Sequence, residues 1–180
     1  SLALQLASSA DSVVVFNEVH YHPATNESAS EWIELHNQMA IDIDLSAWSL
    51  RGGIDYTFAE GTIISGGGHL VIAANPAALQ AATGLTNLAG PFTGRLNNSS
   101  ARLELRDRNG RVMDRLEYGD EGKWPVAPDG SGATLAKRDP GTPGDSPEYW
   151  TSSVVAGGTP GGRNFPKPSA PQRRTYIGFD

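Results

Sequence analysis

The sequence predicts an all-β fold, either a β-sandwich or a small barrel, from three observations. Glycine (21 residues) and proline (12 residues) exceed their usual shares in a chain of 180 residues, which indicates many turns. Roughly eight or nine short segments alternate apolar and polar residues at close spacing, with the period of strands. A single segment carries the start and stop signals of a helix. A chain of this length fits one domain.

The clearest strands lie in the first half of the chain. The stretch "SVVVFNEVHY" is β-branched and aromatic and contains no glycine. The stretch "EWIELHN" alternates, so that Ile33 and Leu35 share one face and Trp32, Glu34 and His36 share the other. Further short strands are predicted in "IDLSAWSLRGG" and "IDYTFAEGTIISGGGHLVIAAN", where glycines interrupt the pattern.

The helix is predicted in "NPAALQAATG". Asn75 is placed to cap its first turn, Pro76 occupies its first position, and Gly84 ends it. The helix is short, and we expect it to decorate a loop of the β-fold.

A hairpin is predicted in "ARLELRDRNGRVMDRLEYG". Leu103 and Leu105 alternate with charged residues before Asn109-Gly110, a pair typical of a two-residue type I′ turn. The register places Asp114 on the apolar side of the second strand. A carboxylate there requires hydrogen-bonding partners, so we expect Asp114 to have them.

The C-terminal third contains more turns. Trp124 is predicted to anchor a loop, and "ATLAKRD" is the last good strand. Residues 140–166 are turn-rich but carry Tyr149 and Trp150, so we expect them to pack along the body of the domain. The resulting organisation is a flexible N-terminal segment at 1–11, a sandwich at 12–165, and a linker or tail at 166–180.

Composition excludes several classes of function. A net charge of −6 argues against nucleic-acid binding, which depends on lysine and arginine, and against docking on an anionic membrane. The absence of cysteine excludes disulfides, thiol catalysis and cysteine zinc sites. No apolar run is long enough to span a bilayer. No serine lies in a nucleophile elbow, and no glycine cluster forms a phosphate-binding loop.

A metal site is one interpretation of the first two strands. Glu18, His20 and His22 project to one side of an extended strand, and Glu34 lies on one side of the next. If the strands pair, imidazoles and carboxylates form a patch that zinc, nickel or copper accepts as ligands. The spacing matches no specific metal motif, and the alternative is a solvated sheet face with cross-strand Glu–His pairs. We favour the solvated face.

Two further candidate sites follow from the aromatic and acidic residues. Trp48 alternates with Leu50 and is expected in the core, whereas Trp32 lies opposite Ile33 and Leu35 and is expected to face outward as a contact surface. Oxygen ligands for a structural calcium ion are available in loops, without EF-hand spacing, at Asp42, Asp44, Asp55, Asp120, Glu121 and Asp129. The alternative for these acids is plain surface.

Seven segments in series resemble the bacterial lamin tail domain family. They cover about residues 13 to 164 and read "VVFNEVHYHP", "EWIELHN", "IDLSAWSLRGGIDYTF", "GTIISGGGHLVIA", "GPFTGRLNNSSARLELRDRNGRVMDRLEYGD", "WPVAPDGSGATLAKRDP" and "GGTPGGRN". The resemblance implies an immunoglobulin-like β-sandwich without catalytic residues. Glu18 and Glu34 belong to the matching pattern, whereas His20, His22 and His36 do not. Eukaryotic relatives are lamin tails linked to chromatin and protein partners, and the acidity of this chain makes DNA a poor partner.

The resemblance implies a non-catalytic accessory module of a larger secreted or surface bacterial protein. Its expected partners are neighbouring domains of the same polypeptide and a protein or glycan, with no nucleic acid and no membrane insertion. Two other classes stay open. One is a metal-dependent hydrolase that uses Glu18, His20, His22 and Glu34, and the other is a structural spacer without a ligand.

Overall fold

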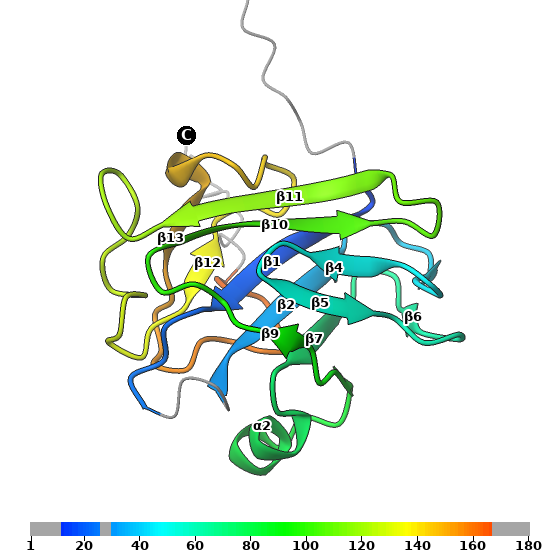
Figure 1. The fold of residues 1–180 in the computed structure, drawn as a ribbon, viewed down its shortest axis with the longest axis horizontal. Helices are drawn as coiled ribbons and strands as arrows, with labels where there is room; N and C mark the ends of the chain where they lie inside the picture. Colours follow the sequence, from blue (N-terminus) through cyan, green and yellow to red (C-terminus); the bar gives the residue numbers. More distant parts are fainter. Residues whose placement is uncertain (1–11, 26–29, 167–180) are drawn as a thin grey trace, which may run out of the picture.

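The computed structural model describes residues 12–25 and 30–166, which form two facing antiparallel sheets (Figure 1). The larger sheet has the order β13 (Trp150–Ser152), β12 (Leu135–Lys137), β1 (Val14–His20), β2 (Trp32–Asn37), β7 (His69–Ala73) and β8 (Leu88–Ala89), of which β8 alone pairs in parallel. The smaller sheet has the order β11 (Val112–Gly119), β10 (Ser100–Arg106), β4 (Ser49–Arg51), β5 (Ile54–Thr57) and β9 (Thr93–Gly94).

Three short elements complete the domain. Strands β3 (Ile43–Asp44) and β6 (Ile63–Ile64) pair with each other, helix α2 covers Pro76–Thr83, and a 3₁₀ turn covers Pro147–Tyr149. This architecture confirms the predicted all-β, immunoglobulin-like sandwich with one short helix. No helix among the described residues is long and apolar enough to cross a membrane.

The hydrophobic core lies between the two sheets. Each strand contributes every second side chain to it, as the alternating patterns predict. Strands β1 and β2 contribute Phe16, Val19, Ile33 and Leu35, all with no exposed surface. The opposite sheet contributes Leu50, Ile54, Leu103, Leu105, Leu116 and Tyr118. Trp48 is 8% exposed within this core, so its predicted core position is confirmed.

The hairpin β10–β11 forms as predicted, but its turn is not type I′. A type I′ turn requires a positive φ at both central residues. Gly110 has a φ of 79°, whereas Asn109 is not among the described residues with positive φ. The turn instead spans four residues from Asp107, whose main-chain oxygen accepts the Gly110 amide at 2.9 Å. The Asp107 carboxylate accepts the amides of Asn109 and Arg111, each at 2.9 Å, and this local bonding selects the longer turn.

The expectation for Asp114 is also confirmed. It is buried on the apolar side of β11, and its Oδ2 accepts the main-chain amide of Phe16 on the facing sheet at 2.8 Å. Burial is the largest influence on the Asp114 carboxyl group and raises its pKa, while the positive charge of Lys137 acts in the opposite direction. The side chain therefore ties the two sheets together at one point.

Helix α2 begins and ends as the sequence predicts. The Asn75 side chain accepts the Ala78 amide at 3.0 Å, and Gly84 ends the helix with a φ of 75°. The helix has no fully buried residue, so capping matters more than burial for holding its ends.

Replacing Asn75 with alanine is expected to weaken α2 by about 1 kcal/mol, because one amide of the first turn loses its acceptor. Hydrogen exchange of the Gly84 amide, which bonds to the Gln80 carbonyl, should accelerate about fivefold. The variant Gln80→Ala serves as the control, since its exposed side chain caps nothing. Equal acceleration in both variants would contradict the assignment of the cap.

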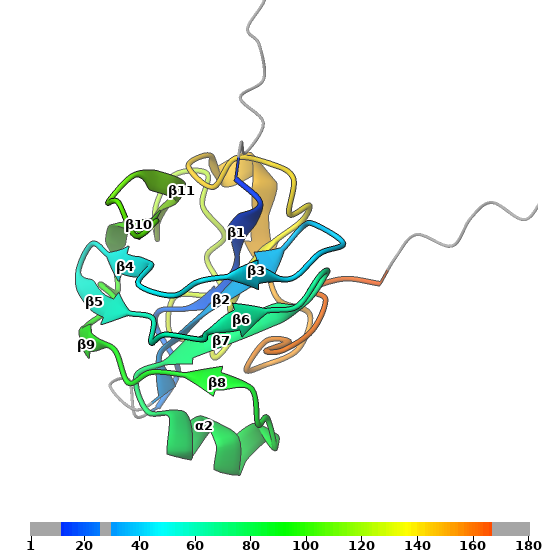
Figure 2. The ribbon, with the colours of Figure 1, turned by 90° about the vertical axis from the view of Figure 1, so that its right-hand side faces the viewer.

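The outer faces of the two sheets differ. Helix α2 and residues 153–166, here called the C-terminal segment, lie over the outer face of the larger sheet (Figure 2). Tyr149 and Trp150, just before this segment, pack against the core, which confirms that the turn-rich end follows the body. The predicted flexible segment at 1–11 and the predicted linker or tail at 166–180, apart from Pro166, lie outside the described residues.

Candidate functional site

The two glutamates of the predicted metal patch do lie side by side. Strands β1 and β2 pair antiparallel, and Glu18 is directly opposite Glu34 in their register. A bulge between Phe16 and Glu18 sets this register, because it lets Phe16 and Val19 both face the core while Glu18 faces outward. Like charges directly opposite each other destabilise a sheet, so the pair needs compensation.

The compensation comes from hydrogen-bond donors of the C-terminal segment. The Thr159 amide donates to Oε2 of Glu18 at 3.1 Å, and the Thr159 hydroxyl donates to the same atom at 3.0 Å. The hydroxyl of Thr134 also donates to Glu18. The Gly161 amide donates to Oε2 of Glu34 at 2.6 Å, and the Asn17 side chain donates to Oε1 at 2.7 Å.

This covering leaves neither carboxyl group any exposed surface. Relative exposure is 0% for Glu18 and for Glu34, so the expectation of a solvated face is wrong at these two positions. The physical reason is the C-terminal segment, whose glycines bring main-chain amides close to the carboxylates. A side chain at Gly158 would place its Cβ 2.4 Å from Oε1 of Glu18, so this approach requires glycine.

Burial changes the protonation of the pair. Desolvation raises the pKa of Glu34 to about 8, the nearby Glu18 adds to the rise, and the bonds from Asn17 and Gly161 oppose it. Desolvation also raises the pKa of Glu18, against the bonds from Thr134 and Thr159. At neutral pH the Glu34 side chain therefore carries a proton, which removes the repulsion between the two groups.

His20 and Trp32 form a second contact on the same face, nearer helix α2. Their rings meet edge to face with centroids 5.9 Å apart. His20 is 7% exposed, and burial lowers its pKa to about 4, so the ring is neutral. Trp32 is 1% exposed and packs with Val71 and Ala73 beneath the helix. The prediction that Trp32 faces outward as a contact surface is therefore wrong, because α2 covers its side of the sheet.

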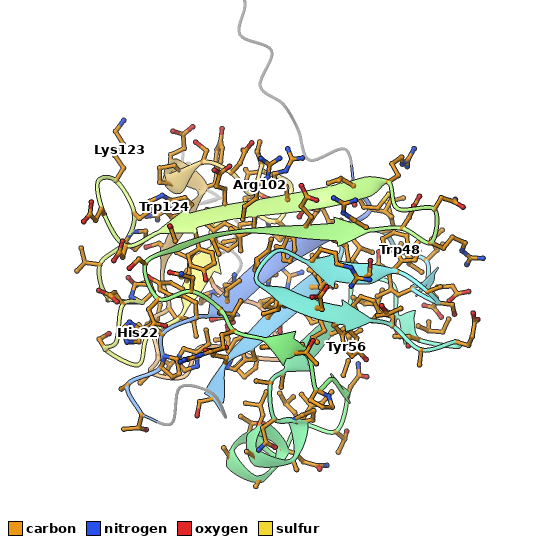
Figure 3. All side chains as sticks on the ribbon, in the orientation of Figure 1. His22, Trp48, Tyr56, Arg102, Lys123 and Trp124 are labelled. Carbon is orange, nitrogen blue, oxygen red and sulfur yellow. The ribbon has the colours of Figure 1, made fainter. Side chains whose placement is uncertain are left out.

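The remaining histidines lie elsewhere. His22 is at one end of the sandwich (Figure 3), where its Nδ1 is 2.5 Å from Oδ1 of Asp129. His36 and His69 stack with ring centroids 4.4 Å apart on neighbouring strands. Burial lowers the pKa of His69 to about 4, and His36 and Arg163 lower it further. Imidazoles that stack in this way present their ring faces to each other.

The structure does not gather the four proposed metal ligands around one point. Glu18 and Glu34 share donors from the C-terminal segment, His20 contacts Trp32, and His22 pairs with Asp129. Within residues 12–25 and 30–166, no group of three or more histidine and acidic side chains is arranged to hold a metal ion. Glu18 and Glu34 therefore serve to fasten the C-terminal segment to the sheet.

Three of the six acids considered for calcium are engaged in separate local contacts. Asp42 accepts the Gly66 amide at 3.0 Å, and Asp44 accepts both the amide and the hydroxyl of Ser46. Asp55 forms an ion pair with Arg51 at 3.4 Å. These contacts are those of turns and surface pairs.

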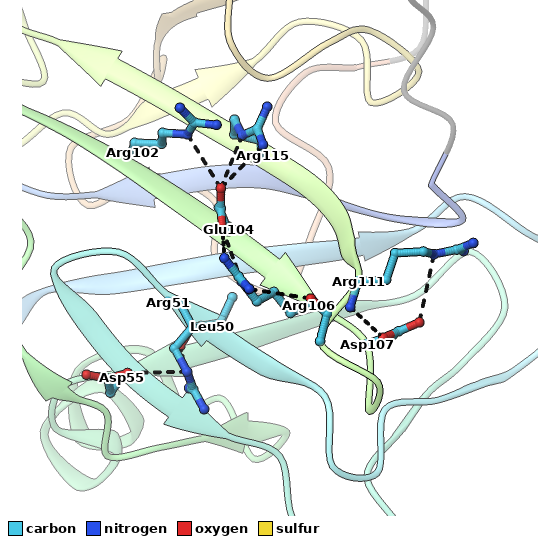
Figure 4. Close-up of polar contacts among 10 residues, drawn as sticks. Leu50, Arg51, Asp55, Arg102, Glu104, Arg106, Asp107, Arg111 and Arg115 are labelled. Atoms are coloured by element: carbon cyan, nitrogen blue, oxygen red, sulfur yellow. Dashed lines mark hydrogen bonds and ion pairs between the residues drawn. The ribbon is translucent and has the colours of Figure 1, made fainter.

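The outward side of the smaller sheet carries a group of arginines that the sequence analysis did not single out (Figure 4). The carboxylate of Glu104 on β10 forms ion pairs with three arginines. Its oxygens are 2.6 Å from Nη2 of Arg106, 3.3 Å from Nη2 of Arg115 and 3.5 Å from Nε of Arg102. Hydrogen bonds from Arg106 are the largest influence on the pKa of Glu104 and lower it. Together with Arg51 these side chains are called the arginine face.

The guanidinium groups of the arginine face reach solvent. The side chains of Arg102, Arg51, Arg106 and Arg115 are 52%, 40%, 40% and 38% exposed. The alternating register of the hairpin could have revealed this face, because Arg102, Arg106 and Arg115 all fall on the side opposite the buried leucines. The overall charge of −6 masked it, since a net charge does not report how charges are distributed.

Comparison with known proteins gives one result. The family model described as Lamin Tail Domain matches residues 7–120, which contain β1 to β11 and thus the complete arginine face and both glutamates. No curated protein matches the chain. Since the family match covers more than half of the 180 residues, the chain belongs to the Lamin Tail Domain family.

Proposed function

We propose that this domain is a non-catalytic binding module of a larger exported bacterial protein, and that it attaches that protein to an anionic glycan. Membership of a family of immunoglobulin-like domains that are generally non-catalytic supports the first part. The arginine face carries the second part. The resemblance to bacterial accessory modules supports an extracellular or cell-surface location, which detection of the full-length product in cell fractions would test.

The four arginines of the arginine face outnumber the acids around them, which are Glu104, Asp55 beside Arg51, and Glu117 opposite Arg102. Three guanidinium groups converge on the single carboxylate of Glu104. A guanidinium group offers five N–H donors in a planar arrangement. One carboxylate has only two acceptor oxygens, so it cannot accept hydrogen bonds from all the donors of three guanidinium groups. The donors that point to solvent fit further carboxylate or sulfate groups. A ligand with several such groups is bound better than one with a single group.

A glycan fits this face better than a peptide. Peptides that bind β-domains commonly add a strand at a sheet edge, where main-chain groups are unpaired. The arginine face consists instead of side chains that project from the flat side of β4, β10 and β11, away from the main-chain bonds within the sheet, although β11 is itself an edge strand. It therefore offers side chains alone. An acidic polysaccharide carries charged groups at regular intervals along the chain and needs no main-chain pairing.

The opposite face cannot take this role in the described structure. The C-terminal segment and α2 cover Glu18, Glu34 and Trp32, which leaves no exposed tryptophan there for sugar stacking. A neutral glycan, which relies on aromatic stacking, is therefore disfavoured as the partner. This contrast between one covered and one open sheet face supports the arginine face as the proposed binding surface.

Binding to a sulfated and to a uronic-acid polysaccharide is expected to weaken about three- to fivefold in Arg102→Gln. Arg102 is the most exposed of the four arginines and contacts Glu104 only at 3.5 Å, so its loss should leave folding intact. Binding should also weaken as salt is raised, since the face is solvent-exposed. Calorimetry on the 180-residue chain at two ionic strengths measures both effects.

The matched control is Arg163→Gln, which removes the same charge from an exposed position on the C-terminal segment. Equal weakening by both variants would show that net charge alone governs binding and would contradict the assignment to the arginine face. Failure of every anionic glycan to bind would favour the structural spacer. Binding of acidic peptides or duplex DNA in preference to glycans would refute the class of partner.

A further inference from the structure

A small pocket lies between helix α2 and the outer face of the larger sheet. Its volume is about 190 Å³, and its floor is formed by His20 and Trp32 of β1 and β2. Ala78, Leu79 and Ala82 of α2 form one wall, and Gly157 of the C-terminal segment closes another side. The pocket is distant in the fold from the arginine face, which is on the other sheet.

The pocket contains one polar atom that has no partner. Nε2 of His20 is buried and has no hydrogen bond within the described residues. A buried polar atom without a partner costs free energy, so such atoms are uncommon in folded proteins. The rest of the lining is largely apolar, and no charged side chain lines the pocket.

The hydrogen bonding of the ring decides what Nε2 can do. The main chain of Ser30 interacts with the ring and favours its protonated form. Since Nε2 has no partner, we assign the single proton of the neutral ring to Nδ1. Burial keeps the imidazole neutral, with a pKa of about 4. Nε2 of a neutral ring whose proton is on Nδ1 is an acceptor. Among the described residues, no donor is bonded to this acceptor, although the hydroxyl-bearing residues Ser30 and Thr83 also line the pocket.

We propose that this pocket binds a small aromatic molecule that carries one hydrogen-bond donor, such as a phenol, with its hydroxyl group donating to Nε2 of His20. The aromatic ring lies against Trp32 and the apolar side of α2. An apolar cavity of about 150 Å³ binds benzene, so a pocket of this size accepts one ring with a substituent. Anionic and cationic ligands are excluded because no opposite charge lines the pocket. This site is independent of the glycan proposal.

Phenol and benzene are the two probes that test the donor requirement. Phenol should bind saturably in an NMR titration, with shifts centred on the His20 ring and the Leu79 methyl groups. Benzene fills similar space but cannot donate a hydrogen bond, so it should bind about tenfold more weakly. Benzoate should not bind there. Equal affinities for phenol and benzene, or no saturable binding of phenol, would overturn the proposal.

Two neighbouring alanines of α2 provide a matched pair of variants. Both Ala81 and Ala82 are exposed, but only Ala82 lines the pocket. Ala82→Leu should fill the space and weaken phenol binding at least tenfold, while Ala81→Leu should leave it unchanged. Both substitutions make the same chemical change on a helix that has no buried residue, so folding is preserved in each. Equal effects of the two variants would overturn the assignment of the pocket.

Discussion

Raising the pH from about 6.5 to about 8 is expected to lower the free energy of unfolding by up to about 2 kcal/mol through Glu34. Folding raises the pKa of this carboxyl group to about 8, mainly because the side chain is desolvated. A group with a raised pKa holds its proton more tightly in the folded state. Its contribution to stability is therefore complete at low pH and is lost as the pH rises through the folded pKa.

The lower limit of the pH window is set by the histidines. Burial lowers the pKa values of His20, His36 and His69 below their ordinary value of 6.5. Below that pH the unfolded chain binds protons at these histidines more readily than the folded chain does. These residues therefore make the free energy of unfolding rise with pH, which is opposite to the effect of Glu34. At pH 6.5 the histidines of the unfolded chain are still half protonated, and they become neutral over roughly the next pH unit. Their opposing effect therefore fades across the window, and it is the same in the wild-type protein and in Glu34→Gln.

Comparison with Glu34→Gln isolates this residue. Urea unfolding of both proteins at several pH values between the two limits gives the slope of stability against pH. The variant should lose the downward slope that Glu34 causes, which is at most about 1.4 kcal/mol per pH unit. A uniform loss of stability from the glutamine amide does not change the slope. Parallel curves for the two proteins would show that Glu34 is ionised in the folded state at neutral pH.

The second large effect is expected at Asn164, which anchors the C-terminal segment. Its Nδ2 donates to the carbonyls of Asn17 at 2.8 Å and Lys137 at 2.9 Å, and its Oδ1 accepts from the Asn17 side chain at 3.0 Å. Asn164→Ala removes all three bonds and leaves buried polar groups without partners. We expect a loss of about 3 kcal/mol, which lowers the melting temperature by roughly 6–12 °C.

Asn109→Ala is the control for this prediction, because Asn109 is exposed at the tip of the β10–β11 hairpin. Its side chain makes none of the buried contacts that Asn164 makes, so its melting temperature should change by no more than about 2 °C. Hydrogen exchange gives a second measurement, since the Thr159 and Gly161 amides should lose protection in Asn164→Ala. Retained protection of these amides would contradict the anchoring role of Asn164.

The fold was largely predictable because strand patterns are local. Alternation in "EWIELHN" assigned Ile33 and Leu35 to the core, and the capping residues Asn75 and Gly84 placed the helix correctly. Asp114 could be expected to have a partner because it lies on an apolar face, although the partner, Phe16, lies 98 residues away. The type of the hairpin turn was wrong because the Asp107 side chain competes with the Asn-Gly preference.

The candidate sites were less predictable because they depend on which segment covers which face. Alternation places Trp32, Glu34 and Glu18 on the side away from the core, but it cannot say whether that side meets water. The residues that cover the two glutamates, from Gly157 to Asn164, follow β2 by more than a hundred positions, and α2, which covers Trp32, is also a separate segment. Their glycines were interpreted as turns, and their function as amide donors to buried carboxylates appears only when the chain is folded.

The sequence by itself determined the strands, the helix and the family of this protein, because periodicity, capping and family motifs are properties of neighbouring residues. The tertiary structure decided that Glu18 and Glu34 are buried, that His20 lines a pocket, and that arginines gather on the open face. The reason is that solvent exposure and charge clustering depend on contacts between distant segments, which alternation along one strand does not specify.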